Sequence, residues 1–335
     1  MYFNTVFKIL AFAWLGSLSA LAFPLENRAE PPPASTVPTG PTPSGVPNNG
    51  VCCGYELVNR GGAYFRYKHE IEFNKRIRGR WEISHGWQVG RSNPSTGQEP
   101  IANENNIVLV PDYGLRLMVP IQHRNASAFS AAEVIFPDII LGGVIEAEIK
   151  MTGVKGTVMD FMTTHADNKL NWGNLGWKDA QVMELVGNSL LESDTGPSPV
   201  GINMVNFDAE TGAQSATSQK FPSGVNPSVG FSKYSIAWYP PASINNPGID
   251  KNTYMAFNDQ PLNAPPKYSA VNPQVVSFSH WCNADTKWAG LPPNEDSSVI
   301  IKRVVAYYDR PIKMATGIGI SRDTCKRENA CKVYM

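Results

Sequence analysis

The feature that most constrains the fold is a succession of short apolar runs in which apolar and polar residues alternate. Successive side chains of a β-strand point to opposite faces, so strict alternation predicts a half-buried strand. In segment 144–151, for example, Ala147 and Ile149 fall on one face and Glu146 and Glu148 on the other. The same pattern predicts strands at 107–110, 115–119, 157–163, 180–186, 202–207, 234–239, 253–257, 275–278 and 299–308.

Turn-forming clusters separate these runs, and no segment shows helical periodicity with capping residues. Examples of such clusters are 93–95, 111–114 and 245–248, and the chain holds 28 Gly and 27 Pro. Many short strands without an alternation of strands and helices predict two packed antiparallel sheets. At this length we expect an all-β jelly-roll β-sandwich.

Charge balance excludes two classes of protein. Lys and Arg total 29, as do Asp and Glu, so the formal net charge is zero. A nucleic-acid binder that works through bulk positive charge needs an excess of clustered basic residues. An acidic disordered chain is excluded too, because 42% of the residues are hydrophobic and 17% are charged. We therefore expect no nucleic-acid partner.

The N-terminus has the pattern of a secretory signal peptide. Lys8 precedes an almost wholly apolar run at 9–22, which closes on the small residues Ala20 and Ala22. The run is too short for a comfortable bilayer span of roughly 20 residues. We predict a signal peptide at 1–22 and no membrane span after its cleavage, which places the protein outside the cell or in the cell wall.

A proline-rich segment follows. Residues 24–47 contain eight of the 27 prolines, with Ser, Thr and Gly between them. Such a sequence cannot bury a core and favours extended, polyproline-like chain. We therefore predict a disordered Pro/Ser/Thr-rich linker at 23–50 and one folded domain at 51–335.

Cysteine usage fits secretion but leaves the pairing open. The five cysteines are Cys52, Cys53, Cys282, Cys325 and Cys331. Disulfides form in oxidising compartments, and an odd count leaves one cysteine unpaired or bonded to another chain. Cys325 and Cys331 are close enough in sequence for a local clip. No cysteine or histidine spacing predicts a zinc site. Asn125 begins the sequon that predicts a glycosylated surface loop.

One segment carries a family resemblance. Residues 177–188 resemble the active-site strand of glycoside hydrolase family 16, whose motif is Glu-x-Asp-x-Glu or a bulged Glu-x-Asp-x-x-Glu. Segments 143–150, 161–164 and 234–240 resemble the neighbouring strands of that family. Segment 280–290 resembles the closing segment of its fungal members.

The resemblance implies a concanavalin A-like jelly roll, a cell-wall β-glucan as partner, and retaining chemistry at two carboxylates. Glu184 takes the acid/base position in either form of the motif. In the bulged form Asp179 takes the nucleophile position and Gln181 replaces the assisting Asp. In the unbulged form those positions are Ala180 and Val182, and no nucleophile remains.

Aromatic and polar residues around the motif complete the expected site. Four tryptophans could stack on sugar rings: Trp172, Trp177, Trp281 and Trp288. His165 could line the same site. We expect no cofactor and no metal centre, although the resemblance allows a structural Ca²⁺ near Asp259, Asp285 and Asp296. We expect a monomer.

Three functions stay open at this stage. The first is a secreted β-glucan hydrolase or transglycosylase with weakened catalytic machinery. The second is a catalytically inactive, lectin-like carbohydrate-binding protein on the same fold. The third is a wall structural protein held by its Pro-rich leader and an intermolecular disulfide. The orientation of Asp179 discriminates between the first two: a position in the cleft favours the enzyme, and a position on the opposite face favours the lectin.

Overall fold

The computed structural model describes residues 52–73, 88–89, 100–121, 129–166, 178–186, 201–239, 253–262, 267–282, 290–310 and 327–335. The predicted signal peptide and linker, at 1–22 and 23–50, lie outside the described residues. Everything described belongs to one compact unit, Pro43–Met335. Within these ranges no helix is long and apolar enough to cross a bilayer.

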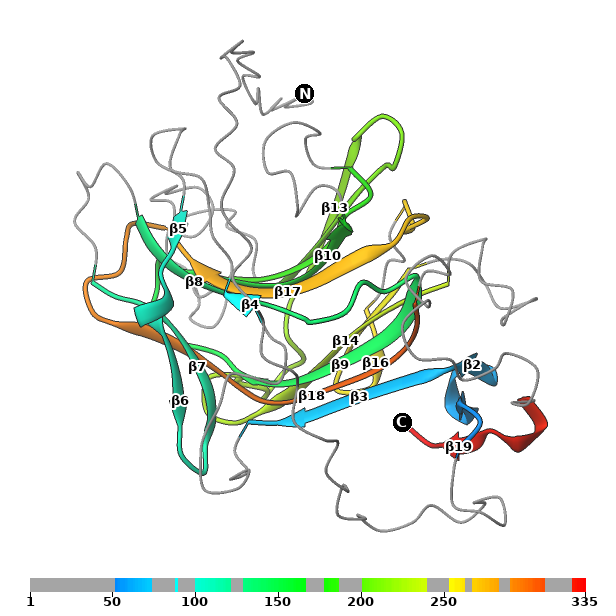
Figure 1. Ribbon diagram of the computed structural model, residues 1–335. Coiled ribbons are helices and arrows are strands. Elements are labelled where there is room, and N and C mark those ends of the chain that lie inside the picture. Colours follow the sequence, from blue (N-terminus) through cyan, green and yellow to red (C-terminus); the bar gives the residue numbers. More distant parts are fainter. Residues whose placement is uncertain are drawn as a thin grey trace, which may run out of the picture. The chain divides into compact units, whose positions relative to one another are not determined.

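The unit contains two eight-stranded sheets, here called sheet 1 and sheet 2 (Figure 1). Sheet 1 has the order β13-β12-β11-β10-β17-β8-β4, with β5 parallel to β8. Its strands are β13 (Gln214–Gln219), β12 (Ile202–Phe207), β11 (Gln181–Val186), β10 (Val158–His165), β17 (Gln274–Trp281), β8 (Phe129–Ile135), β4 (Gln88–Val89) and β5 (Pro100–Ala102). Figure 1 shows sheet 1 curved, with the face turned away from sheet 2 on the inside of the curve.

Sheet 2 is wholly antiparallel and has the order β16-β15-β14-β9-β18-β7-β6, with β3 paired to β18. Its strands are β16 (Gln260–Pro261), β15 (Tyr254–Phe257), β14 (Ser232–Trp238), β9 (Gly142–Lys150), β18 (Ser297–Asp309), β7 (Gly114–Val119), β6 (Ile107–Val110) and β3 (Tyr67–Glu72). Short 3₁₀ turns occur at η1 (Val58–Arg60), η3 (Glu104–Asn106) and η6 (Arg327–Asn329).

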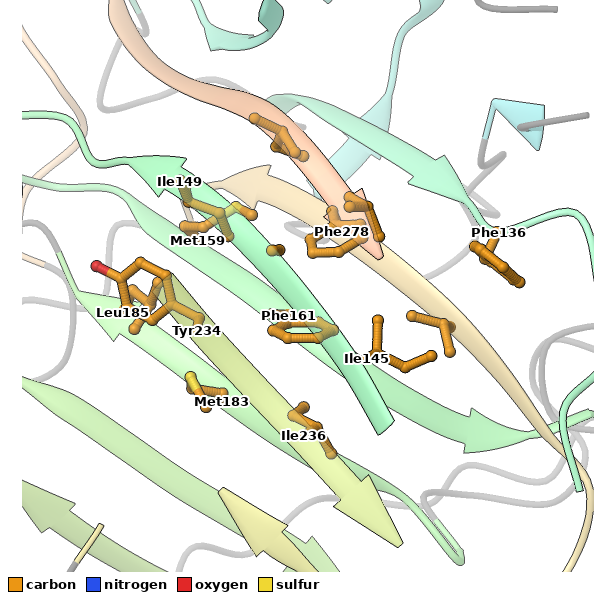
Figure 2. Close-up of a cluster of buried hydrophobic side chains, with 14 of the residues drawn as sticks. Phe136, Ile145, Ile149, Met159, Phe161, Met183, Leu185, Tyr234, Ile236 and Phe278 are labelled. Carbon is orange, nitrogen blue, oxygen red and sulfur yellow. The ribbon is translucent and has the colours of Figure 1, made fainter. Parts of the chain in front are cut away.

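The main hydrophobic core lies between the two sheets. Figure 2 shows side chains of both sheets meeting in one cluster: Met159, Phe161, Met183, Leu185 and Phe278 from sheet 1, and Ile145, Ile149, Tyr234 and Ile236 from sheet 2. The rings of Phe161 and Phe278 stack with their centroids 4.7 Å apart. Each such side chain contributes roughly 1.5–3 kcal/mol when fully buried. The inward face of every central strand is therefore fixed by this core.

The predicted all-β sandwich is confirmed, and each strand expected from alternation is present. In β9 the expected faces hold: Ala147 and Ile149 are buried in the core, whereas Glu148 lies on the opposite face and bonds Lys302. Sequence reasoning missed β13, because this edge strand is polar and mostly exposed and carries no apolar stripe.

A third, small sheet joins the two ends of the domain and packs against sheet 2. It has the order β19-β1-β2, formed by β19 (Cys331–Val333), β1 (Tyr55–Leu57) and β2 (Ala63–Phe65). Leu57 and Phe65 pack on Val144 and Tyr307, which lie on the outer face of sheet 2. The terminal segments therefore cover sheet 2.

A disulfide joins Cys52 to Cys331 across this small sheet. This bond excludes the local clip between Cys325 and Cys331 that the sequence left open, because parallel pairing of β1 with β19 brings Cys331 to a partner 279 residues away. Cys53 is also disulfide-bonded. In the described part of the chain the free thiol is that of Cys282, which is fully buried, and burial raises its pKa to about 12.

Gly156 lies in the turn that leads into β10, where the backbone of another chain segment approaches it closely. Its φ is +88°, and an added Cβ would lie 1.9 Å from the carbonyl oxygen of Leu291. Gly224 has a similar φ of +81°, but nothing lies within 4 Å of its added Cβ. We predict that Gly156→Ala destabilises the domain by about 2 kcal/mol more than Gly224→Ala in urea unfolding. Equal losses would show that the close approach of the two chain segments is absent.

Candidate functional site

Strand β11 carries the segment that resembles the family motif, and the core determines how it is oriented. Met183 and Leu185 are fully buried between the sheets. Because strand side chains alternate, Val182 and Glu184 lie on the outer face of sheet 1. The pairing of β11 with β10 and β12 runs without a register shift, so this assignment holds along the whole strand.

Glu184 belongs to a continuous row of polar side chains across the outer face of sheet 1. The register pairs each member with the next, from β13 through β12, β11, β10 and β17 to β8. This polar row consists of Ser218, Asn203, Glu184, Asp160, Ser279 and Glu133. Its members come from segments far apart in the sequence.

Hydrogen bonds tie the polar row together. Asn203 Nδ2 donates to Glu184 Oε2 over 2.5 Å, and Ser218 Oγ donates to Asn203 Oδ1 over 2.9 Å. Asp160 Oδ2 accepts from Trp281 Nε1 over 2.5 Å and from Ser279 Oγ over 3.3 Å. The donors on both sides hold the two carboxyl groups in place.

Both carboxyl groups bind protons more tightly than usual. Burial raises the pKa of Glu184 to about 7, although the hydrogen bond from Asn203 acts against this shift. Burial and then the charge of Glu184 hold the pKa of Asp160 well above its ordinary value. A carboxyl group with a pKa near 7 can serve as a proton donor at neutral pH.

Apolar side chains flank the polar row on both sides. Towards one end of the strands lies a cluster of Met162, Ala180, Val182 and Val205. Towards the other end, Val158 and Val186 pack with the half-buried ring of Trp281. A polar stripe between apolar patches suits a sugar chain, whose hydroxyl groups form hydrogen bonds while its ring faces pack on apolar surface.

The structure does not bring Asp179 and Gln181 to Glu184, which corrects the bulged interpretation of the motif. Asp179 precedes β11 with a φ of +51°. Its carboxylate accepts hydrogen bonds from the backbone N–H groups of Val271 and Asn272 and from Gln274 Nε2, at 2.8–3.0 Å. Gln181 is fully buried and points to the core side, because it is three residues from Glu184 in a regular strand.

The unbulged form of the motif matches the observed faces. Ala180 and Val182 pack together on the outer face with Glu184 one step further along. The positions that the family fills with a nucleophile and an assisting Asp are therefore apolar. The second carboxylate beside Glu184 is Asp160, which the neighbouring strand β10 supplies.

The other predicted site residues fall in three places. Trp281 lies on the outer face of sheet 1, where its Nε1 donates to Asp160. His165 ends β10 on the same face as Phe161, which is the core side, so it does not share a face with Glu184. Trp172, Trp177, Trp288 and the sequon residue Asn125 lie outside the described residues.

The carboxylates considered for a structural Ca²⁺ have other partners. Asp259 pairs with Lys233 at 2.5 Å, and Asp296 accepts from the backbone N–H of Ile121. Asp285 lies outside the described residues. In the described ranges no three His, Cys, Asp or Glu side chains gather as a metal site would require.

Sequence reasoning missed Asp160, Asn203, Ser279 and Glu133 as site residues. Asp160, Asn203 and Glu133 each lie between apolar neighbours of their own strand, and Ser279 lies between Phe278 and His280. Only the pairing of distant strands brings these residues into one row with Glu184. One signal was available: Asp160 interrupts an apolar run, where a buried carboxyl group needs an explanation.

Comparisons with known proteins give a fold but no sequence relative. No family model matches the chain, and no curated protein matches it. Solved structures do. The β-glucanase of Bacillus licheniformis matches with a TM-score of 0.52 at 15% identity, over 73% of this chain and 98% of that one.

Two further structures match equally well. LamA_E269S of Zobellia galactanivorans, in complex with laminaritriose and laminaritetraose, has a TM-score of 0.53 at 16% identity, over 72% of this chain and 99% of that one. The endo-β-1,3-glucanase of Pyrococcus furiosus has a TM-score of 0.52 at 16% identity, over 77% and 98%. This chain shares their fold. At such identities the likeness concerns the β-sandwich alone.

The hydrogen bond from Asn203 predicts a specific change in the titration of Glu184. Asn203→Ala removes a donor that favours the charged carboxylate, so the pKa of Glu184 should rise above about 7. Asn206→Ala is the matched control, since Asn206 lies on the same strand but faces the other way and accepts from the N–H of Tyr268. Carboxyl ¹³C NMR measures both. A rise in the control alone would contradict the assignment.

The raised pKa of Glu184 also predicts how the free energy of unfolding varies with pH. Its pKa in the folded state, about 7, exceeds the ordinary value of 4.5, so the folded protein binds more protons between these values. The resulting stabilisation is complete below pH 4.5 and is lost as the pH rises through 7. Relative to Glu184→Gln, the wild type should lose about 1–2 kcal/mol of unfolding free energy over this range. Urea unfolding at several pH values measures this difference. The prediction is refuted if the unfolding free energies of the wild type and Glu184→Gln change with pH by the same amount.

Proposed function

We propose that this protein is a secreted carbohydrate-active protein that binds a neutral β-glucan chain across the outer face of sheet 1. The polar row carries the proposal: three carboxyl groups, an amide and two hydroxyl groups lie in register between apolar clusters on the inside of the sheet's curve. The shared fold with glucanases, one of them solved with laminari-oligosaccharides, supports the same class of ligand.

The charge of the polar row favours a neutral polymer over an anionic one. Among the described residues, no salt bridge supplies a cation to Glu184 or Asp160. A polysaccharide that carries sulfate or carboxylate groups would meet like charge there, which raises the free energy of binding. A neutral glucan offers hydroxyl groups, which can both donate to the carboxylates and accept from Asn203.

Glu184 is the residue best placed to donate a proton to the bound sugar. It is the half-buried member of the carboxyl pair, whereas Asp160 is 7% exposed. Its pKa of about 7 keeps a large protonated fraction at neutral pH. In a hydrolase or transglycosylase this proton would go to the glycosidic oxygen.

Binding without hydrolysis is the second candidate. Ala180 and Val182 occupy the outer-face positions beside Glu184 on β11, and neither can act as a nucleophile. Asp179, the alternative nucleophile, is 1% exposed and held by three hydrogen bonds on the core side. These observations favour a lectin-like protein, in which the polar row holds the sugar without cleaving it.

Secretion and a wall location are part of the proposal. The Cys52–Cys331 disulfide and the bonded state of Cys53 support an oxidising compartment. They agree with the leader expected at 1–22. The buried Cys282 thiol, with its raised pKa, is unsuited to an intermolecular disulfide. This argues against the third hypothesis, a structural wall protein that such a disulfide would hold in place.

Calorimetric titration with a laminari-oligosaccharide tests the binding face. We expect Trp281→Ala to weaken binding roughly tenfold, because an aromatic anchor at a binding face carries much of the free energy. The control is Tyr113→Ala, which removes an exposed aromatic ring beside Phe231 in the turn that joins β6 to β7 of sheet 2. Binding that survives Trp281→Ala but is lost in Tyr113→Ala would place the ligand on the other sheet.

Product analysis of the same samples separates the two candidates. If the protein cleaves laminarin or lichenan, Glu184→Gln should remove most of the turnover and leave binding nearly intact. If the wild type binds but releases no product under any condition, it is the non-hydrolytic protein. Absence of binding to β-glucans of every linkage would overturn the proposed function.

A further inference from the structure

Asp160 and Glu184 form an unusual pair, because they are direct cross-strand neighbours on one face. The register of β10 and β11 sets them opposite each other, and both alternate with core residues, Met159 and Phe161 on one strand and Met183 and Leu185 on the other. Side chains paired in this way have Cβ atoms about 5 Å apart. Two carboxyl groups on such short stems lie within reach of each other.

The hydrogen bonds of Asp160 leave one oxygen atom unaccounted for. Oδ2 accepts from Trp281 and Ser279, whereas Oδ1 is buried and has no partner in the described part of the chain. A buried carboxylate oxygen without a donor costs free energy. If that oxygen shares a proton with Glu184, the O–H bond supplies the missing partner.

Among the residues that the structure describes, no basic side chain faces the pair. The described groups that face it are Asn203 from β12, Ser279 and Trp281 from β17 and, one strand further, Glu133 from β8 and Ser218 from β13. Four of these groups are neutral, and the fifth is acidic. Two adjacent carboxylates in such a place cannot both ionise cheaply.

We propose that Asp160 and Glu184 hold one proton between them at neutral pH, and that Asp160 is the positioning residue that keeps this proton at Glu184, where an oxygen atom of a bound sugar can replace Asp160 Oδ1 as its acceptor. The first half stands on the register and on the unpartnered oxygen. The second half rests on the proposed function. The pair gives the site a donor that its three carboxyl groups would otherwise lack.

Carboxyl ¹³C NMR of the full chain, labelled at Asp and Glu, tests the shared proton directly. In the wild type we expect the two carboxyl groups to titrate in two steps, with both signals moving in each step. In Asp160→Asn the upper step should vanish, and Glu184 should titrate once, about one pH unit or more below that step. Glu184→Gln should produce the reciprocal result at Asp160, and because Glu184 is half-buried this variant guards against misfolding of the first.

Glu133→Gln is the matched control, since it removes a carboxyl group from the same polar row but keeps the pair. Both steps should remain, with the upper one displaced by less than in Asp160→Asn. If Asp160 and Glu184 each titrate in one step, and neither step moves when the other residue is neutralised, the shared proton is refuted.

The pH dependence of glucan binding tests the positioning role. In the wild type, affinity should fall with rising pH along the upper step, and in Asp160→Asn this fall should move to lower pH by the shift seen in the NMR titration. A binding profile that stays unchanged while the titration shifts would refute the positioning role alone. Two-step titration in a protein that binds no glucan would leave the shared proton standing and overturn the proposed function.

Discussion

The packing of Met183 and Leu185 into the core is the interaction on which the site depends. Because strand side chains alternate, this packing forces Glu184 to the outer face of sheet 1. A slip of one residue would bury the carboxyl group between the sheets and expose two large apolar side chains. That exchange would cost several kcal/mol, so the core defines the register of β11 and with it the position of Glu184.

The same constraint acts on each neighbouring strand, and together these constraints place the members of the polar row on one face. Met159 and Phe161 orient Asp160, Ile202 and Met204 orient Asn203, and Phe278 orients Ser279. No single strand carries the site. Its chemistry arises where five antiparallel pairings place one polar residue from each strand on a line. The two carboxyl groups here lie on two neighbouring strands, whereas the motif that segment 177–188 resembles has both on one strand.

How much of this was visible in the sequence differs between the fold and the site. The central strands and the β-sandwich followed from local alternation, which is a property of each segment alone. The position of Glu184 followed from the motif. Asp160 could not be predicted, because its partner on β11 depends on non-local pairing. Asp179 was assigned to the site from the bulged form of the motif that segment 177–188 resembles. The left-handed turn at its φ of +51° breaks the strand pattern before β11 and directs the carboxylate to the core side.

The most direct test of the account is a crystal structure of the protein with a β-1,3-glucan oligosaccharide long enough to cross several strands. The account predicts that the sugar lies over the outer face of sheet 1, with a hydroxyl group or glycosidic oxygen within hydrogen-bond distance of Glu184 and a ring against Trp281. An oligosaccharide bound at full occupancy to the outer face of sheet 2, with the polar row in contact with solvent alone, would contradict it.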